Sequence, residues 1–271
     1  MKAMILAAGL GSRLKPLTDT RPKALVELSG RTLLEITLTR LRTFGVTEFI
    51  INVHHFADQI IAYLKSHKDF GLRIEISREE VLLDTGGGLK RAAWFFLEDP
   101  KNLDEPFLLH NVDVLSTIDF SRMLQFHKEN HALATLAVQS RDSSRQLLFN
   151  HELQLVGRRI ARDSKPELVS SLAGNCHSER SEESAFSSDS PLATSHSPLP
   201  LAFSGIHILS PRLLPLLTED GIFSIIDSYL RLSSQRQKIL AFRADQYYWR
   251  DLGRPTDLAQ AALDLQQNAL L

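Results

Sequence analysis

The sequence predicts an α/β fold: a doubly wound, mostly parallel sheet in a single domain that spans residues 1–271. Apolar runs of strand length alternate along the chain with stretches in which apolar residues recur at helical spacing. The chain, of which 43% is apolar, is long enough to bury one large core. A glycine-containing turn directly follows the first apolar run, as expected where strands of such a sheet end.

The first half of the chain is predicted to form repeated strand–helix units. Residues 3–8 are an apolar strand, and residues 33–44 have helical spacing until Gly45 ends the pattern. The remaining units are strands at 48–53, 73–77 and 106–109, and helices at 56–64 and 90–97. We therefore expect ligand-binding groups at the carboxyl ends of these strands.

The second half is less regular. We expect helices at 120–127, 212–217, 222–232 and 256–265, strands at 132–139, 201–209 and 238–242, and a hairpin near Asn150. Residues 174–200 are rich in serine and proline and contain few large apolar side chains. This segment is predicted to be a disordered insertion within the domain, because it cannot offset the entropy of its own ordering.

Composition limits the partners of the chain. Its 31 basic and 32 acidic residues give a net charge of −1, so no global field attracts nucleic acid or a membrane, and we expect neither as a partner. The apolar runs are too short to span a bilayer, and a cytoplasmic location is expected. The single Cys176 allows no internal disulfide, and no zinc-type spacing occurs. The oligomeric state stays open.

The turn after the first strand is suited to phosphate. Gly9 and Gly11 let main-chain N–H groups approach an anion, and Arg13 and Lys23 supply positive charge. Two common nucleotide loops are excluded, because Leu14 stands where a dinucleotide fingerprint has its third glycine and the pattern GxxxxGK[ST] is absent. The chemistry is predicted to act on nucleotide phosphates.

Three further stretches are candidates for the site. Gly86 and Gly87, with a third glycine after them, precede a helix pattern and could take an anion or a flat base, or could be a flexible linker. Asp113 follows a buried strand, where it could bind Mg²⁺ or be an ordinary solvated residue. Ser204 and Gly205 lie within a strand pattern, where a glycine marks either close approach of a sugar or a bulge.

The pattern Gly9-x-Gly11-x-Arg13-x-x-Pro16-Leu17-Thr18, followed by Pro22-Lys23, resembles the signature of sugar-1-phosphate nucleotidyltransferases. The segments LLDTGGGL, HNVDV, FSGIHIL and YWRDLGRPTDL follow in the order expected of that family. The resemblance implies a Rossmann-like nucleotidyltransferase fold, Mg²⁺ as cofactor, and substrates that are a nucleoside triphosphate and a sugar 1-phosphate. The implied catalytic residues are Arg13, Lys23, Asp113 and Asp251, of which Asp113 and Asp251 would bind the metal. The implied nucleotide-binding residues are Ala7, Ala8, Gly9, Gly11, Arg13, Lys23, Glu79, Gly86 and Gly87, and those for the sugar are Asn111, Ser204 and Gly205.

Within that family the chain looks most like the short N-acetylmuramate-1-phosphate uridylyltransferases of cell-wall recycling, which favours UTP. The alternative is a guanylyltransferase for mannose or heptose 1-phosphate, in which Glu79 or Glu80 would accept hydrogen bonds from guanine. A different class of hypothesis is a non-catalytic sensor of nucleotide sugars. A dinucleotide-dependent oxidoreductase is disfavoured, because the loop lacks its third glycine.

The chain departs from the family pattern at three places. Val112 stands where glycine is usual between Asn111 and the aspartate, so its side chain could reshape the pocket. A Glu-Lys-Pro segment near the sugar is reduced to a stretch in which only Lys165 is a candidate contact. Arg250 replaces an apolar residue beside Asp251, and could face solvent or add a phosphate contact.

Overall fold

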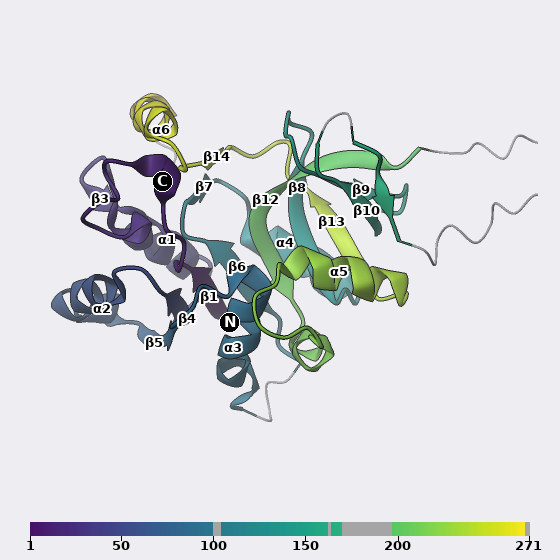
Figure 1. The fold of residues 1–271 in the computed structure, drawn as a ribbon, viewed down its shortest axis with the longest axis horizontal. Coiled ribbons are helices and arrows are strands. Elements are labelled where there is room, and N and C mark those ends of the chain that lie inside the picture. The colour runs from purple at the N-terminus through teal and green to yellow at the C-terminus, as the bar shows by residue number, and fades with distance from the viewer. Residues whose placement is uncertain (100–103, 162–163, 170–196, 269–271) are drawn as a thin grey trace, which may run out of the picture.

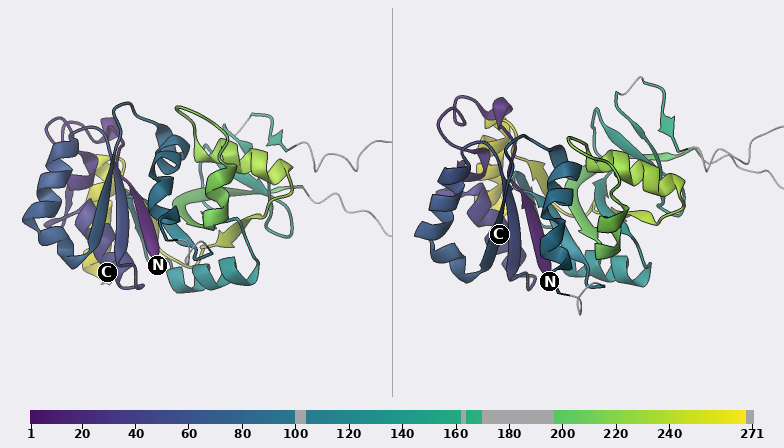
Figure 2. Two further views of the ribbon diagram at one scale, coloured as in Figure 1. Left: turned by 90° about the horizontal axis from the view of Figure 1, so that it is seen from below. Right: turned by 60° about the horizontal axis from the view of Figure 1, so that its bottom comes forward.

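The computed structural model describes residues 1–99, 104–161, 164–169 and 197–268. Ten strands form a mixed central sheet, and helices cover both of its faces (Figures 1 and 2). Residues 174–196 of the predicted insertion lie outside the described residues. Its last two residues, Leu199 and Pro200, begin a strand, so that end of the prediction is wrong.

The elements have the following bounds. The strands of the central sheet are β1 (Lys2–Leu6), β4 (Glu48–Val53), β5 (Arg73–Arg78), β6 (Phe107–Asn111), β8 (Ala134–Gln139), β9 (Gln146–Phe149), β10 (Leu155–Arg159), β11 (Glu167–Leu168), β12 (Leu199–Leu209) and β13 (Ile239–Arg243). Two small sheets pair β2 (Glu27–Leu28) with β3 (Arg31–Thr32) and β7 (Val114–Ser116) with β14 (Trp249–Asp251). The α-helices are α1 (Leu33–Arg42), α2 (Ala57–Ser66), α3 (Asp84–Leu97), α4 (Phe120–Glu129), α5 (Ile225–Ser234) and α6 (Pro255–Asn268). Short 3₁₀ helices are η1 (Ser12–Leu14), η2 (Lys23–Leu25), η3 (Lys68–Gly71) and η6 (Pro211–Leu216).

The predicted parallel arrangement is confirmed in one half of the sheet. Strands β6, β1, β4 and β5 lie in that order and are all parallel. Beyond β6 the sheet is mixed, because β12 runs antiparallel to β6 and to β8, while β13 is parallel to β8. The carboxyl ends of β1, β4 and β6 therefore meet at one edge, which is where such sheets bind their ligands.

Alternation along the strands divides the core into two layers. On β1, Met4 packs in a cluster with Phe95 of α3 and Tyr229 of α5. Its neighbours Ala3 and Ile5 point the other way, into a cluster built with α1, α2 and α4. Because successive side chains of a strand face opposite sides, one apolar run supplies both layers (Figure 2).

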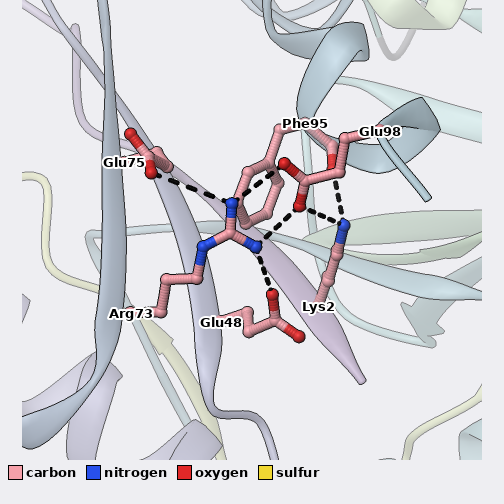
Figure 3. Close-up of polar contacts among 6 residues, drawn as sticks. All are labelled: Lys2, Glu48, Arg73, Glu75, Phe95 and Glu98. Atoms are coloured by element: carbon pink, nitrogen blue, oxygen red, sulfur yellow. Dashed lines mark hydrogen bonds and ion pairs between the residues drawn. The ribbon is translucent and has the colours of Figure 1, made fainter.

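An ion network joins three parallel strands to α3 at the amino ends of the strands (Figure 3). Arg73 of β5 donates to Glu48 at 2.6 Å and to both oxygens of Glu98, and Lys2 of β1 donates to Glu98 at 2.7 Å. The hydrogen bonds from Arg73, and then that from Lys2, lower the pKa of Glu98 to about 2. The Arg73 guanidinium also lies 5.3 Å from the ring centroid of Phe95. The network fixes α3 against the end of the sheet opposite to the ligand edge.

Most predicted elements are confirmed, and the exceptions have local causes. Strand β4 has the predicted bounds. Of the helix predicted at 212–217, residues 212–216 form a 3₁₀ helix, in which Pro215 has no N–H for an α-helical hydrogen bond. Helix α5 begins at Ile225 rather than at residue 222, because the Ser224 side chain caps it by accepting from the Ile226 N–H. Within the described ranges, none of the helices has the length and apolar composition needed to cross a membrane.

Candidate active site

A cavity of about 510 Å³ opens at the carboxyl edge of β1, β4 and β6. Each of these strands supplies polar or main-chain groups to it from its last two residues or just beyond them. The residues that line the cavity are Leu6, Ala7, Ala8, Gly9, Gly11, Ser12, Arg13, Lys23, Asn52, Leu82, Asp84, Thr85, Asn111, Val112, Asp113, Ile222 and Gly253. The structure thus brings together the predicted phosphate loop and the predicted metal ligand Asp113.

The phosphate loop has a backbone conformation that requires glycine at one position. Gly11 has φ +66°, and its carbonyl accepts hydrogen bonds from the Thr18 hydroxyl at 2.8 Å and from the Leu14 N–H at 2.9 Å. A Cβ atom on Gly11 would come within 2.9 Å of the Thr18 methyl group. These contacts hold η1, and with it the side chain of Arg13, at the mouth of the cavity.

Lys23 and Asp113 form an ion pair on the cavity wall. The Lys23 side chain is 10% exposed and the Asp113 side chain 17%, so the two charges lie where the dielectric constant is low. Removing either partner would leave the other as an uncompensated, largely buried charge. The pair therefore places a cation and a carboxylate side by side where a phosphate chain would enter.

Asp251 approaches the same place from the far end of the chain. Strand β14 pairs with β7 so that Asp251 is opposite Val114, and the Leu252 N–H donates to the Asp113 carbonyl at 2.8 Å. Arg13 Nη2 lies 3.9 Å from Asp251 Oδ1. Burial raises the pKa of Asp251, and the negative charge of Asp113 raises it further, against the opposing effect of Lys23. The negative charges of Asp113 and Asp251 thus repel each other.

This pair fits a magnesium ion. Mg²⁺ is commonly held by one or two protein carboxylates together with phosphate oxygens and water. Asp113 lines the cavity together with the cations Arg13 and Lys23, and Asp251 lies next to this lining, beside Arg13 and Gly253, so the two carboxylates are such a donor set. In the part of the chain that the structure describes, no group of three or more His, Cys, Asp or Glu side chains could hold a metal alone. The substrate would therefore complete the coordination.

Glu79 lies behind the cavity rather than in it. It is 3% exposed, and its carboxylate accepts from Asn52 Nδ2 at 2.7 Å and from the Leu83 N–H at 2.9 Å. Asn52, which does line the cavity, accepts from the Ala7 N–H at 2.8 Å. Glu79 is not among the residues that line the cavity, and a protein donor reaches each of its oxygens, so its contact with a base stays a prediction. The same network engages the Ala7 N–H, while Ala8 and Gly9 also line the cavity.

The triple glycine is part of α3 rather than a loop before it. The N–H groups of Gly86 and Gly87 both point at the Phe223 carbonyl, at 3.0 and 3.4 Å. A Cβ atom would overlap the Phe223 ring at Gly86 and come 2.5 Å from the Gly221 carbonyl oxygen at Gly87. Gly86 and Gly87 therefore give close packing against residues 221–223 instead of lining the base and ribose, and their neighbours Asp84 and Thr85 line the cavity.

Of the predicted sugar-binding residues, only Asn111 lines the cavity. Ser204 is fully buried, and its carbonyl accepts from Trp249 Nε1 at 2.7 Å. Gly205 has φ +72° in a register shift of β12, and a Cβ atom there would come 2.7 Å from Asn111 Nδ2. The bulge alternative is thus confirmed at Gly205, which supports Asn111 from behind.

The three departures from the family pattern also have structural outcomes. The side chain of Val112 is 4% exposed and packs in the core, although the residue borders the cavity. Lys165 is exposed and does not line the cavity. Arg250 points away from the site, because it pairs with Asp264 of α6 at 2.9 Å.

Sequence reasoning missed several wall residues. Asn52 is the last polar residue of an apolar strand run, and its position at the end of β4 could have identified it. Thr85, Ile222 and Gly253 had no comparable signal, because residues distant in sequence determine where they lie.

The fold and the site define a class: an α/β protein that presents a glycine loop, two cations and a carboxylate to one cavity, with a second carboxylate beside them. Residues 2–147, more than half of the chain, match the family model described as "Nucleotidyl transferase". The chain belongs to this family.

Comparisons with known proteins agree with this assignment. The chain is 46% identical over 114 residues to N-acetylmuramate alpha-1-phosphate uridylyltransferase of Caulobacter vibrioides, covering 40% of this chain and 47% of that protein. It is 42% identical over 126 residues to the protein of the same name from Neisseria meningitidis, covering 46% and 52%. A mannose-1-phosphate guanyltransferase of Yarrowia lipolytica is 27% identical over 264 residues, covering 95% and 62%. The chain thus spans about half to two thirds of the length of these relatives.

Solved structures show the same fold. HddC from Yersinia pseudotuberculosis, complexed with GMP-PN, superposes with a TM-score of 0.70 at 21% identity, covering 97% of this chain and 99% of that one. UDP-glucose pyrophosphorylase complexed with UDP-glucose superposes with a TM-score of 0.71 at 16% identity, covering 98% of each chain. The predicted fold class is therefore confirmed.

Proposed function

We propose that this chain joins a nucleoside triphosphate to a sugar 1-phosphate, giving a nucleotide sugar and pyrophosphate, with Mg²⁺ as cofactor. The observation that supports this best is that Asp113 pairs with Lys23 on the cavity wall, while Asp251 lies 3.9 Å from Arg13, which also lines the cavity. The names of the relatives, which are transferases of this kind, support it independently.

In the proposed reaction an oxygen of the sugar phosphate attacks the α-phosphorus of the nucleotide in line with the departing pyrophosphate. The repulsion between two anions is the main barrier that the protein can lower. Lys23 and Arg13 offset the crowded negative charge, and the loop from Ala8 to Gly11 offers main-chain N–H groups to the triphosphate. Asp113 and Asp251 would hold Mg²⁺, which neutralises phosphate charge and aligns the reacting groups. Asn111 faces the sugar.

We infer that UTP is the nucleotide and N-acetylmuramate 1-phosphate the sugar, which links the reaction to the cell wall. The two uridylyltransferases are 46% and 42% identical over their matched residues, whereas the Yarrowia guanyltransferase is 27% identical. Nucleoside triphosphates are cytoplasmic metabolites, so the reaction belongs in the cytoplasm. A guanylyltransferase is the second candidate, because a guanyltransferase of Aspergillus fumigatus is 37% identical over 139 residues. The sensor hypothesis has no such support.

The test is a substrate panel with the full chain. Pyrophosphate release is measured for ATP, CTP, GTP and UTP, each with the 1-phosphates of N-acetylmuramate, mannose and glucose, with and without Mg²⁺. We expect Mg²⁺-dependent release with UTP and N-acetylmuramate 1-phosphate. Strict use of GTP would overturn the choice of nucleotide. Binding of a nucleotide sugar without turnover of any substrate pair would overturn the proposal that the chain is an enzyme.

A further inference from the structure

Arg141 lies just after β8 and is held by contacts to the polypeptide around it. Its guanidinium carbon is 3.7 Å from the ring centroid of Trp249, and its Nη2 donates to the Phe203 carbonyl at 2.6 Å. Its Nε is buried and has no hydrogen-bond partner. In the described parts of the chain no carboxylate forms an ion pair with Arg141, and burial lowers its pKa. A partly buried arginine with an unpaired N–H group and no carboxylate partner lacks a counter-ion.

The alternation of β14 places Arg141 on the same side as the predicted metal ligand. Trp249 and Asp251 are two residues apart on this strand, so both side chains project from one face. Arg250, between them, points to the other face and pairs with Asp264 of α6. Because Arg141 stacks on Trp249, it shares the face of Asp251, and the charge of Asp251 acts on it.

The contacts of Arg141 connect it to the part of the site that we assign to the sugar. Arg141 and Trp249 donate to the consecutive carbonyls of Phe203 and Ser204. The next residue, Gly205, is packed against Asn111, which lines the cavity. The glycine loop and Lys23, which we assign to the triphosphate, contribute none of these contacts.

We propose that Arg141, positioned by Trp249, binds the phosphate group of the sugar 1-phosphate as it lies beside Asp251. This inference rests on the function proposed above. A planar guanidinium can give a phosphate two parallel hydrogen bonds, and stacking on an indole ring restricts its orientation before the substrate arrives. Arg141 is not itself among the residues that line the cavity, but it shares a face of β14 with Asp251 and contacts the segment that supports Asn111.

The test separates the two substrates kinetically. In Arg141→Gln we expect KM for the sugar 1-phosphate to rise about 10- to 100-fold, the range for loss of a charge-assisted hydrogen bond, with KM for the nucleoside triphosphate changed less than about two-fold. Arg145→Gln is the matched control, because Arg145 is an exposed arginine of the same connection. Arg141→Lys keeps the charge without the planar fork, and we expect an intermediate KM. If Arg141→Gln does not fold, the KM of Arg141→Lys for the sugar 1-phosphate provides the test.

The outcomes distinguish the inference from the function on which it rests. An active wild type with a sugar-specific rise in KM supports both. An active wild type whose Arg141 variants keep the KM for the sugar, or lose affinity for the nucleotide instead, overturns this inference alone. A wild type that releases no pyrophosphate with any pair of the panel overturns the proposed function and this inference with it.

Discussion

Gly253 lies directly against the carboxylate of Asp251, and a Cβ atom at position 253 would overlap Oδ1 of that side chain. The same Cβ atom would come 2.7 Å from Nη2 of Arg13, so glycine leaves the space in which the two charges meet. Gly253 thus sets the separation between one end of the phosphate loop and one predicted metal ligand.

Gly253→Ala should therefore lower kcat/KM about 10- to 100-fold, because displacement of a reacting group by about 1 Å can cost this much. Asp251 or Arg13 must move to admit the methyl group. The measurement is steady-state pyrophosphate release together with the unfolding midpoint. Thr256→Ala, at an exposed position near the start of α6, is the control and should keep wild-type activity. Full activity in Gly253→Ala would mean that the Arg13–Asp251 geometry is not needed.

Asp113→Asn should reduce turnover on the order of 10²–10³-fold, by analogy with other preorganised charge stabilisers. The substitution removes one carboxylate from the predicted metal pair and leaves Lys23 buried without its partner. Pyrophosphate release is measured over a range of Mg²⁺ concentrations, with circular dichroism to establish that the variant is folded. Asp104→Asn, at an exposed position, is the control. Near-normal turnover in the folded variant would remove Asp113 from the metal site.

The sequence predicts those parts of the fold and site that depend on neighbours in the chain. The bounds of β4 could be predicted because a continuous β-branched run is typical of a strand that is buried on both faces. Asp113 could be placed at the ligand edge because it lies two residues beyond the end of β6. The phosphate loop was recognisable for the same reason, since Gly9 to Lys23 form one continuous segment.

The parts that could not be predicted depend on contacts between distant segments. Gly86 and Gly87 suggest a flexible or anion-binding loop until residues 221–223 are seen packed on them. Glu79 was expected at the base, yet Asn52 and the Leu83 N–H take both of its oxygens. The glycines correctly indicate a close approach at positions 86 and 87, but they do not show that residues 221–223 are the segment that approaches. For Glu79, the sequence does not show that Asn52 and Leu83 are its partners.

Glu79→Gln should weaken binding of every nucleoside triphosphate, because Glu79 positions Asn52, which in turn holds the main chain at Ala7. The NH₂ group of glutamine would face either the Leu83 N–H or Asn52 Nδ2, both of which are donors. The donor that it faces would then lose its acceptor. The expected cost is about 1.5–3 kcal/mol, the range for hydrogen bonds to charged groups. Affinities for UTP and GTP are measured by calorimetry.

Glu80→Gln is the matched control for this substitution, since Glu80 is the exposed neighbour. The pattern of loss across nucleotides distinguishes the two roles of Glu79. A similar loss for UTP and GTP supports the positioning role. A loss confined to GTP would mean that Glu79 reads guanine directly, as the sequence suggested.

Two buried histidines should make the protein less stable as the pH falls. Burial lowers the pKa of His110 to about 4 and that of His207 to about 3, and each Nδ1 is hydrogen bonded, to the Asn111 carbonyl and to the Tyr229 hydroxyl. Above pH 6.5 both are neutral in the folded and unfolded chains; between pH 6.5 and about 4 only the unfolded chain takes up their protons. The free energy of unfolding should thus fall with decreasing pH, by up to about 1.4 kcal/mol per pH unit for each histidine. Urea unfolding between pH 5 and 7.5 measures this slope, and His207→Gln should reduce it below pH 6.5 by the contribution of one histidine. An unchanged slope in that variant would mean that His207 is protonated in the folded state, so that its burial does not disfavour the charge.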